Sequence, residues 1–199
     1  MKHRRTPFAL LALLNFGAAQ AAPAPAPSTY GALGGQWWLW ALTAPSDRNP
    51  VNDLTGKHCD VNQTHPVFFL AQSPRNGTLV RRTCTVPADK PLFFPLYTQS
   101  VVRETKAGCE DRMQTLKLDM DAVTDLQLSV DAQAPSAGMP LNGTRGTMAC
   151  TYLPDLGVWL GTDGYWASVT FDQPGKHTVA WSGVTGRFRQ NVRYTLTVR

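Results

Sequence analysis

The sequence predicts an all-β protein: a single β-sandwich or Greek-key barrel with one short helix and two disulfides. Short segments that are apolar, or that alternate apolar and polar residues, occur along most of the chain, as expected of strands. Turn residues separate them about every 8–12 residues, a spacing typical of sandwiches and barrels. Four cysteines without any Cys-x-x-Cys pair indicate disulfides rather than a zinc or redox motif. We expect one domain over 30–199, which is long enough for its own core.

Eight segments are predicted as strands and one as a helix. Asn76-Gly77 predicts a hairpin turn between the second and third strands. Pro91 and Pro95 enclose residues 92–94 and confine them to a short strand or a sheet edge. The helix is predicted over 109–121, because good helix formers and i,i+4 charge pairs occur there. The predicted strands are 36–42, 67–70, 78–84, 92–94, 126–130, 165–171, 177–181 and 192–198.

The cysteines are expected to form two disulfides, each contributing roughly 2–4 kcal/mol to stability, mainly by restricting the unfolded chain. Four cysteines allow three pairings. The pairing of neighbours along the sequence, Cys59–Cys84 with Cys109–Cys150, is preferred.

The N-terminus predicts export from the cell. Residues 2–5 are basic, residues 8–16 form a short apolar run, and Ala19-Gln20-Ala21 has the small-x-small pattern of a signal peptidase site. We therefore expect a signal peptide at 1–21, followed by an extended Pro/Ala-rich linker at 22–29. The apolar run is about half the roughly 20 residues that span a bilayer, so no transmembrane segment is expected after cleavage. The predicted location is the periplasm, the cell surface or the medium.

The charge of the chain excludes some partners. The whole sequence carries 19 Lys and Arg against 14 Asp and Glu, a formal net charge of +5. Removal of Lys2, Arg4 and Arg5 with the signal peptide would leave about +2, which is too mild to indicate nucleic acid as a partner. The C-terminal arginines at positions 187, 189, 193 and 199 are spaced as on the solvated face of a strand.

Several motifs together resemble a family of small exported bacterial proteins. They include Trp37-Trp38-x-Trp40-Ala41-Leu42, Asn49-Pro50-x-x-Asp53-x-Thr55-Gly56-x-x-Cys59, Arg82-x-Cys84-x-Val86-Pro87, Asp163-Gly164-Tyr165-Trp166 and Pro174-Gly175-x-His177-Thr178. The resemblance extends over nearly all of 36–199 and implies an exported β fold without an established activity. The sequence departs from the family pattern at His65, where Gly is common, and at Ala180, where a second histidine is common.

Three histidines suggest a metal site. His58 and His65 flank a loop that begins at Cys59, and His177 opens a strand after a tight turn. Imidazole suits copper, so we hypothesise a three-histidine copper site with superoxide dismutase-like activity. Arg81 and Arg82 would attract the anion. The alternative is that the three histidines share no ligand. The sequence has no His-x-His pair, which disfavours the copper hypothesis.

Six tryptophans support a competing class of function. Trp37 and Trp38 are adjacent in a predicted strand and would point to opposite faces, so at least one is a candidate for stacking on a sugar ring. The alternative functions are a non-catalytic carbohydrate- or cell-wall-binding module, or a structural subunit of a surface assembly. The partners would then be components of the cell envelope or surface layer.

The sequence contains no Gly-x-Ser-x-Gly elbow, no His-Glu-x-x-His motif, no EF-hand loop and no Walker motif. Four aspartates are available for a carboxylate pair of the glycosidase kind. Each of these aspartates lies next to or near a Gly, Pro or Asn residue. Aspartate in such a position usually stabilises a turn, so we predict turn residues instead. These residues are Asp53, Asp60, Asp155 and Asp163.

Overall fold

Eight strands and two α-helices make up the regular structure of the computed structural model, which describes residues 27–132 and 143–199. The predicted signal peptide at 1–21 and residues 22–26 of the predicted linker lie outside the described residues. Residues 27–29 of that linker are not extended but form the start of α1. The elements are α1 (Pro27–Thr43), a 3-10 turn (Ser46–Arg48), β1 (Phe68–Phe69), β2 (Val80–Val86), β3 (Leu92–Arg103), α2 (Lys106–Asp121), β4 (Thr124–Val130), β5 (Thr144–Leu153), β6 (Val158–Val169), β7 (Gly175–Thr185) and β8 (Phe188–Val198).

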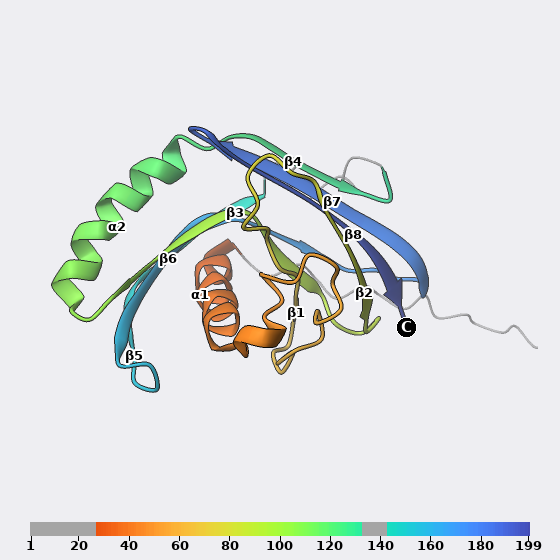
Figure 1. Ribbon diagram of the computed structural model, residues 1–199, viewed down its shortest axis with the longest axis horizontal. Helices are drawn as coiled ribbons and strands as arrows, with labels where there is room; N and C mark the ends of the chain where they lie inside the picture. Colours follow the sequence, from red (N-terminus) through yellow and green to blue (C-terminus); the bar gives the residue numbers. More distant parts are fainter. Residues whose placement is uncertain (1–26, 133–142) are drawn as a thin grey trace, which may run out of the picture.

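The strands form two mixed four-stranded sheets (Figure 1). The first sheet has the order β1-β3-β6-β5, and β1 is parallel to β3. The second has the order β2-β8-β7-β4, and β2 is parallel to β8. The other neighbouring strands are antiparallel. The prediction of a mostly β protein is confirmed.

The two sheets share the largest hydrophobic core. On β8 alternate residues from Val192 to Val198 are buried, while Arg193 and Thr195 on the opposite face are exposed. This alternation places one face of the second sheet against the first. Trp181 of β7 stacks between Phe94 of the first sheet, at 4.5 Å between ring centroids, and Tyr194, at 5.7 Å.

Helix α1 covers the other face of the first sheet (Figure 1). Tyr30, Trp37 and Trp40 pack there against Phe93 and Trp166. The buried positions recur every three or four residues, which is the period of a helix. The sequence-based strand over 36–42 is therefore wrong, and residues 27–132 and 143–199 contain two α-helices rather than the one predicted.

Three glycines in α1 obscured this period in the sequence. The helix lies so close to the first sheet that a Cβ added at Gly34 would be 2.6 Å from the Trp166 ring. A Cβ at Gly31 would be 2.3 Å from the Thr147 main-chain oxygen. Glycine is a poor helix former, so its presence disfavoured a helix, although close packing against the sheet requires it here.

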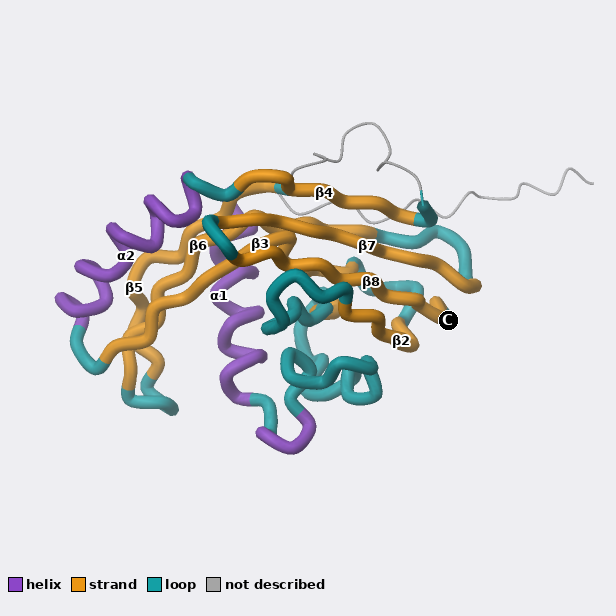
Figure 2. Tube along the Cα trace, turned by 45° about the horizontal axis from the view of Figure 1, so that its top comes forward, coloured by secondary structure: helices purple, strands orange, loops and turns teal. Residues whose placement is uncertain are grey.

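Helix α2 confirms the predicted helix and begins three residues earlier, at Lys106. Met113, Leu116 and Met120 face the first sheet, and Figure 2 shows the helix at the end of the molecule remote from residue 199. The preferred disulfide pairing is also confirmed: Cys109–Cys150 ties α2 to β5, and Cys59–Cys84 ties a loop to β2. Neither described helix is long and apolar enough to cross a bilayer.

The predictions for Asn76-Gly77 and for residues 92–94 are both wrong. Asn76-Gly77 does not close a hairpin, because β1 and β2 belong to different sheets. The Asn76 side chain instead accepts from the Arg189 amide at 2.9 Å and donates to the Arg187 carbonyl at 3.1 Å, which fixes this turn to the start of β8. Residues 92–94 begin the twelve-residue β3, which lies between β1 and β6. Pro95 is tolerated because the pairing with β6 is irregular between Pro95 and Tyr97.

Candidate ligand-binding site

A cavity of about 350 Å³ opens where α1, β3, the start of β8 and the loop after β1 meet. Its walls combine aromatic rings, amides and hydroxyls, and none of the lining side chains is charged. The lining residues are Trp38, Gln72, Ser73, Pro74, Tyr97, Thr98, Gln99, Ser100, Phe188 and Gln190. We call it the Trp38 cavity.

Hydrogen bonds hold the Trp38 ring in place. The indole Nε1 donates to the Thr98 hydroxyl at 3.1 Å, and that hydroxyl donates to the Asp163 carbonyl at 2.9 Å. Trp37 packs edge-on against Trp38 with 5.3 Å between ring centroids. The exposed part of the Trp38 ring is therefore preorganised before a ligand arrives.

The glutamine side chains that line the cavity differ in how firmly hydrogen bonds and burial fix them. The buried Gln190 side chain donates to the Leu96 carbonyl at 2.7 Å, which fixes its orientation. Gln99 is only partly buried and donates to the Tyr97 hydroxyl at 3.1 Å. Burial raises the pKa of Tyr97 above its ordinary value of 10.0, so its hydroxyl is neutral near pH 7. The cavity therefore offers neutral donors and acceptors beside aromatic surface.

The structure separates the two tryptophans proposed for sugar stacking. Trp37 is fully buried in the core below α1, so its assignment as a stacking residue is corrected. Trp38 lines the cavity and stays available to a ligand. Sequence reasoning missed the other lining residues, because it ended β3 at residue 94 and began β8 at residue 192. The alternation of β8 does extend back to Gln190 and was the signal that could have revealed that residue.

The structure places the three histidines in separate environments. His177 lies at the start of β7, where Nδ1 is 2.8 Å from the Asp131 carboxylate and Nε2 is 3.0 Å from the Gln173 carbonyl. His65 packs on the Phe69 ring at 4.9 Å between ring centroids. His58 lies in the loop before Cys59, where its main-chain amide donates to Asp53. Within residues 27–132 and 143–199, no group of three or more His, Cys, Asp or Glu side chains is arranged to hold a metal ion.

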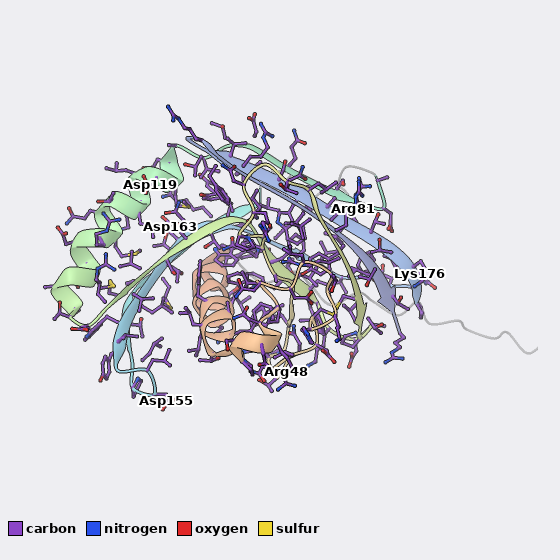
Figure 3. All side chains as sticks on the ribbon, in the orientation of Figure 1. Arg48, Arg81, Asp119, Asp155, Asp163 and Lys176 are labelled. Carbon is purple, nitrogen blue, oxygen red and sulfur yellow. A yellow bond between two sulfur atoms is a disulfide. The ribbon has the colours of Figure 1, made fainter. Side chains whose placement is uncertain are left out.

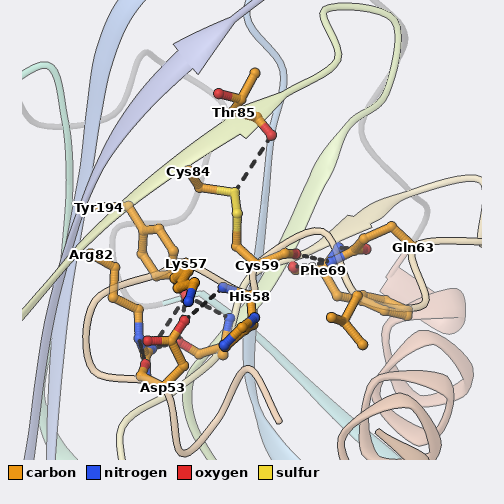
Figure 4. The surroundings of a disulfide bond; sticks show 12 residues. Asp53, Lys57, His58, Cys59, Gln63, Phe69, Arg82, Cys84, Thr85 and Tyr194 are labelled. Carbon is orange, nitrogen blue, oxygen red and sulfur yellow. Dashed lines mark hydrogen bonds between the residues drawn. A yellow bond between two sulfur atoms is a disulfide. The ribbon is translucent and has the colours of Figure 1, made fainter. Parts of the chain in front are cut away.

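The two arginines proposed to steer an anion also differ. Arg81 is exposed on the outer face of β2 (Figure 3). Arg82 is only 2% exposed, so it is not available to attract an anion from solvent. Its guanidinium donates to the Tyr194 hydroxyl and to four main-chain oxygens. These oxygens belong to Val51, Asp53, Ala71 and Gln72. Figure 4 shows Arg82 with Tyr194 and Asp53 near the disulfide.

Asp163 is not a turn residue but a buried carboxylate in the middle of β6. Figure 3 places it near α2. It accepts from Arg145 at 2.8 Å, from the Thr147 hydroxyl at 2.9 Å and from the Gly164 amide at 2.8 Å. Arg145 also pairs with Asp121 of α2. The hydrogen bond to Asp163 is the main cause that raises the pKa of Arg145. Arg145 of β5 thus connects Asp163 of β6 with Asp121 of α2.

Asp53 does act as the predicted turn residue. Its carboxylate accepts from the Thr55 amide and hydroxyl and from the His58 amide, all within 2.8 Å. Desolvation raises the pKa of Asp53, but these hydrogen bonds outweigh it and bring the pKa below its ordinary value of 3.8.

The environment of His65 predicts a pH dependence of stability. Desolvation on Phe69 and the positive charge of Lys90 lower the pKa of His65 below its ordinary value of 6.5. The folded state thus binds fewer protons than the unfolded state, so the free energy of unfolding should fall as the pH drops below that ordinary value. Urea unfolding between about pH 8 and pH 5 measures this slope, and His65→Gln should make it shallower. Equal slopes in both proteins would contradict this role of His65.

The fold and its cavity define a disulfide-linked, mostly β protein with a cavity that is lined by aromatic and neutral polar side chains. No protein-family model, curated protein or solved structure matches this chain.

Proposed function

We propose that this protein is an exported, non-catalytic β-sandwich protein of the cell envelope that binds a neutral saccharide in the Trp38 cavity. The observation that carries the proposal is the composition of that cavity: three aromatic rings, three amides and hydroxyl groups, with no charged side chain in the lining. Sugar rings present C–H groups on their faces and hydroxyls at their edges. Aromatic surface suits the faces, and fixed amides and hydroxyls suit the edges.

The size of the cavity limits the ligand. Small-molecule sites have volumes of about 300–1,000 Å³. At about 350 Å³ the Trp38 cavity lies at the lower end of this range, which suits one or two sugar rings. The Trp38 ring would provide the stacking surface, while Gln99 and Ser100, neither fully buried, would contact ring hydroxyls.

Other features support export and the sandwich architecture. Disulfides persist mainly in oxidising compartments, and both disulfides here close without a free cysteine in the described residues. A large core shared by the inner faces of two sheets is typical of a sandwich. The residues that resemble the exported family have structural roles, such as Asp53 in its turn and Arg82 beneath it.

The copper hypothesis stays a prediction without support from the described residues. His177 already uses both ring nitrogens in hydrogen bonds, and no contact joins it to His58 or His65. A structural role in a surface assembly also stays a prediction, and it requires no ligand in the Trp38 cavity. The following experiment distinguishes it from saccharide binding.

Trp38→Ala should weaken saccharide binding at least about tenfold, because it removes the stacking surface. The probes are glucose, N-acetylglucosamine, cellobiose and chitobiose, titrated against tryptophan fluorescence and checked by calorimetry. At least one should show saturable binding to the unaltered protein. Gln99→Ala should weaken the same interaction through loss of a hydrogen bond, without removing any aromatic contact.

Tyr152→Ala is the matched control. Tyr152 is an exposed aromatic residue on β5 and does not line the cavity, so its removal should leave saccharide affinity unchanged. Thermal unfolding of each variant establishes that it is folded. Saccharide binding is contradicted if none of the four probes binds, or if both cavity variants bind as tightly as the unaltered protein.

A further inference from the structure

A second cavity, of about 550 Å³, lies on the outer face of the second sheet beside the Cys59–Cys84 disulfide. The loop at 56–60, β2, the start of β7 and the end of β8 form its walls. Its lining is polar and carries three cationic side chains against one carboxylate. The lining residues are Gly56, Lys57, Cys59, Asp60, Thr83, Cys84, Thr85, Lys176, Thr195, Thr197 and Arg199. We call it the Lys57 cavity.

The two cavities are separate. Gln190 of the Trp38 cavity is on the buried face near the start of β8, whereas Thr195 and Thr197 are on the other face near its end. Residues of opposite parity on a strand point to opposite faces of the sheet. A ligand in one cavity therefore has no contact with the other cavity.

Four threonine hydroxyls line the Lys57 cavity in two adjacent rows. Because β2 and β8 are parallel and in register, Thr83 lies beside Thr195 and Thr85 beside Thr197. Further along the same face Arg81 lies directly beside Arg193, and both are exposed. Two like charges side by side destabilise a sheet. The two guanidinium groups also add to the positive potential of this face.

The three cations of the cavity have no ion-pair partner in the part of the chain that the structure describes. Among the described residues, no ion pair involves Lys57, Lys176 or Arg199. Lys176 donates to the Thr197 hydroxyl at 2.6 Å, which holds its ammonium group at the cavity wall. The main chain of Arg199 is fixed by a hydrogen bond from its amide to the Val86 carbonyl at 3.1 Å.

The loop that carries Lys57 is held rigidly against β2. The disulfide joins Cys59 to Cys84, and the Thr83 amide donates to the Thr55 carbonyl at 2.9 Å. Gly56 has a φ of +85° and approaches β2 so closely that an added Cβ would be 2.2 Å from the Thr83 carbonyl oxygen. Figure 4 shows Lys57 and the disulfide together. The main-chain position of Lys57 relative to the threonines is thus set before a ligand binds.

We propose that the Lys57 cavity is an anion site that binds a phosphate group, either free or carried on a sugar. Lysine and arginine donate strong, charge-assisted hydrogen bonds to phosphate oxygens, and threonine hydroxyls add neutral donors. A tetrahedral anion with several acceptor oxygens can engage Lys57, Lys176 and the threonines together. Asp60 lies at the same wall and repels an anion, but the three cationic side chains of the lining outnumber it.

Calorimetry at low ionic strength tests the site with three probes: inorganic phosphate, glucose 6-phosphate and glucose. We expect saturable binding of at least one of the phosphate compounds, weakened by added salt. Lys57→Ala and Lys176→Ala should each weaken that binding about fivefold or more, because each removes a charge-assisted hydrogen bond. Tighter binding of glucose 6-phosphate than of inorganic phosphate would indicate that the sugar also contacts the cavity.

Two variants serve as controls. Arg112→Ala removes the same charge from the exposed surface of α2, at the other end of the molecule (Figure 2), and should leave phosphate affinity unchanged. Trp38→Ala should also leave it unchanged, which separates this site from the proposed saccharide site. The anion site is ruled out if neither phosphate compound binds, if both lysine variants bind phosphate normally, or if glucose competes equally with phosphate in the Trp38→Ala protein.

Discussion

Arg82→Ala should lower the free energy of unfolding by about 3–5 kcal/mol, the range expected when a buried, hydrogen-bonded charge is removed and its partners are left unpaired. The guanidinium is buried between the loops at 51–53 and 71–72, and it donates to oxygens of both. Without it, four buried or partly buried carbonyl oxygens lose a donor. The Arg82–Tyr194 contact, with 5.6 Å from the guanidinium carbon to the ring centroid, is lost as well.

The neighbouring arginine provides the control. Arg81→Ala removes the same charge one residue away from an exposed position and should change the free energy of unfolding by less than about 0.5 kcal/mol. Urea or guanidinium unfolding with the disulfides intact measures both values. A loss below about 1 kcal/mol for Arg82→Ala would mean that water or rearranged loops satisfy the carbonyl groups, contrary to the role described for Arg82.

Trp37→Ala should lower the free energy of unfolding by about 3–5 kcal/mol, as large-to-small changes in a core do. Trp37 is completely buried, and its ring lies within 6 Å, centroid to centroid, of the rings of Trp38, Trp40 and Trp166. Its indole Nε1 also donates to the Leu70 carbonyl at 2.9 Å, so the variant leaves a buried acceptor unpaired. The same unfolding measurement applies.

Leu42→Ala is the matched control for Trp37→Ala, because Leu42 is on the same helix and is 43% exposed. Leu42→Ala should lower the free energy of unfolding much less than Trp37→Ala, since truncation of a partly exposed side chain removes little buried area. If the two variants were equally stable, α1 would not bury the face that contains Trp37. The sequence-based strand over 36–42 would then have to be reconsidered.

The sequence by itself determined the β class, the helix α2 and the disulfide pairing. These follow from local information: alternation on strands such as β8, helix formers from 109 onward, and cysteines near each other along the chain. Positions of turns were also predicted for Asp53 and for Gln173-Pro174-Gly175. Each of these signals depends on residues that are neighbours in the sequence, so no knowledge of the fold is needed to interpret it.

Tertiary structure decided the rest. The segment around Trp37 has aromatic residues that suit a strand, but it forms a helix because Gly31 and Gly34 allow it to pack closely on the first sheet. Arg81 and Arg82 are adjacent in the sequence, yet one is exposed and the other buried, because β2 presents alternate residues to opposite faces. The buried carboxylate of Asp163 accepts hydrogen bonds from Arg145 and Thr147, which are 18 and 16 residues away in the sequence.

Both cavities are likewise products of long-range packing. Trp38 donates to Thr98, 60 residues away in the sequence, and the distant residues Lys57 and Lys176 line the same cavity. The sequence could supply candidates such as Trp38, but not their partners. Burial energy and charge compensation depend on which segments meet, and the parallel pairing of β2 with β8 cannot be read from either strand alone.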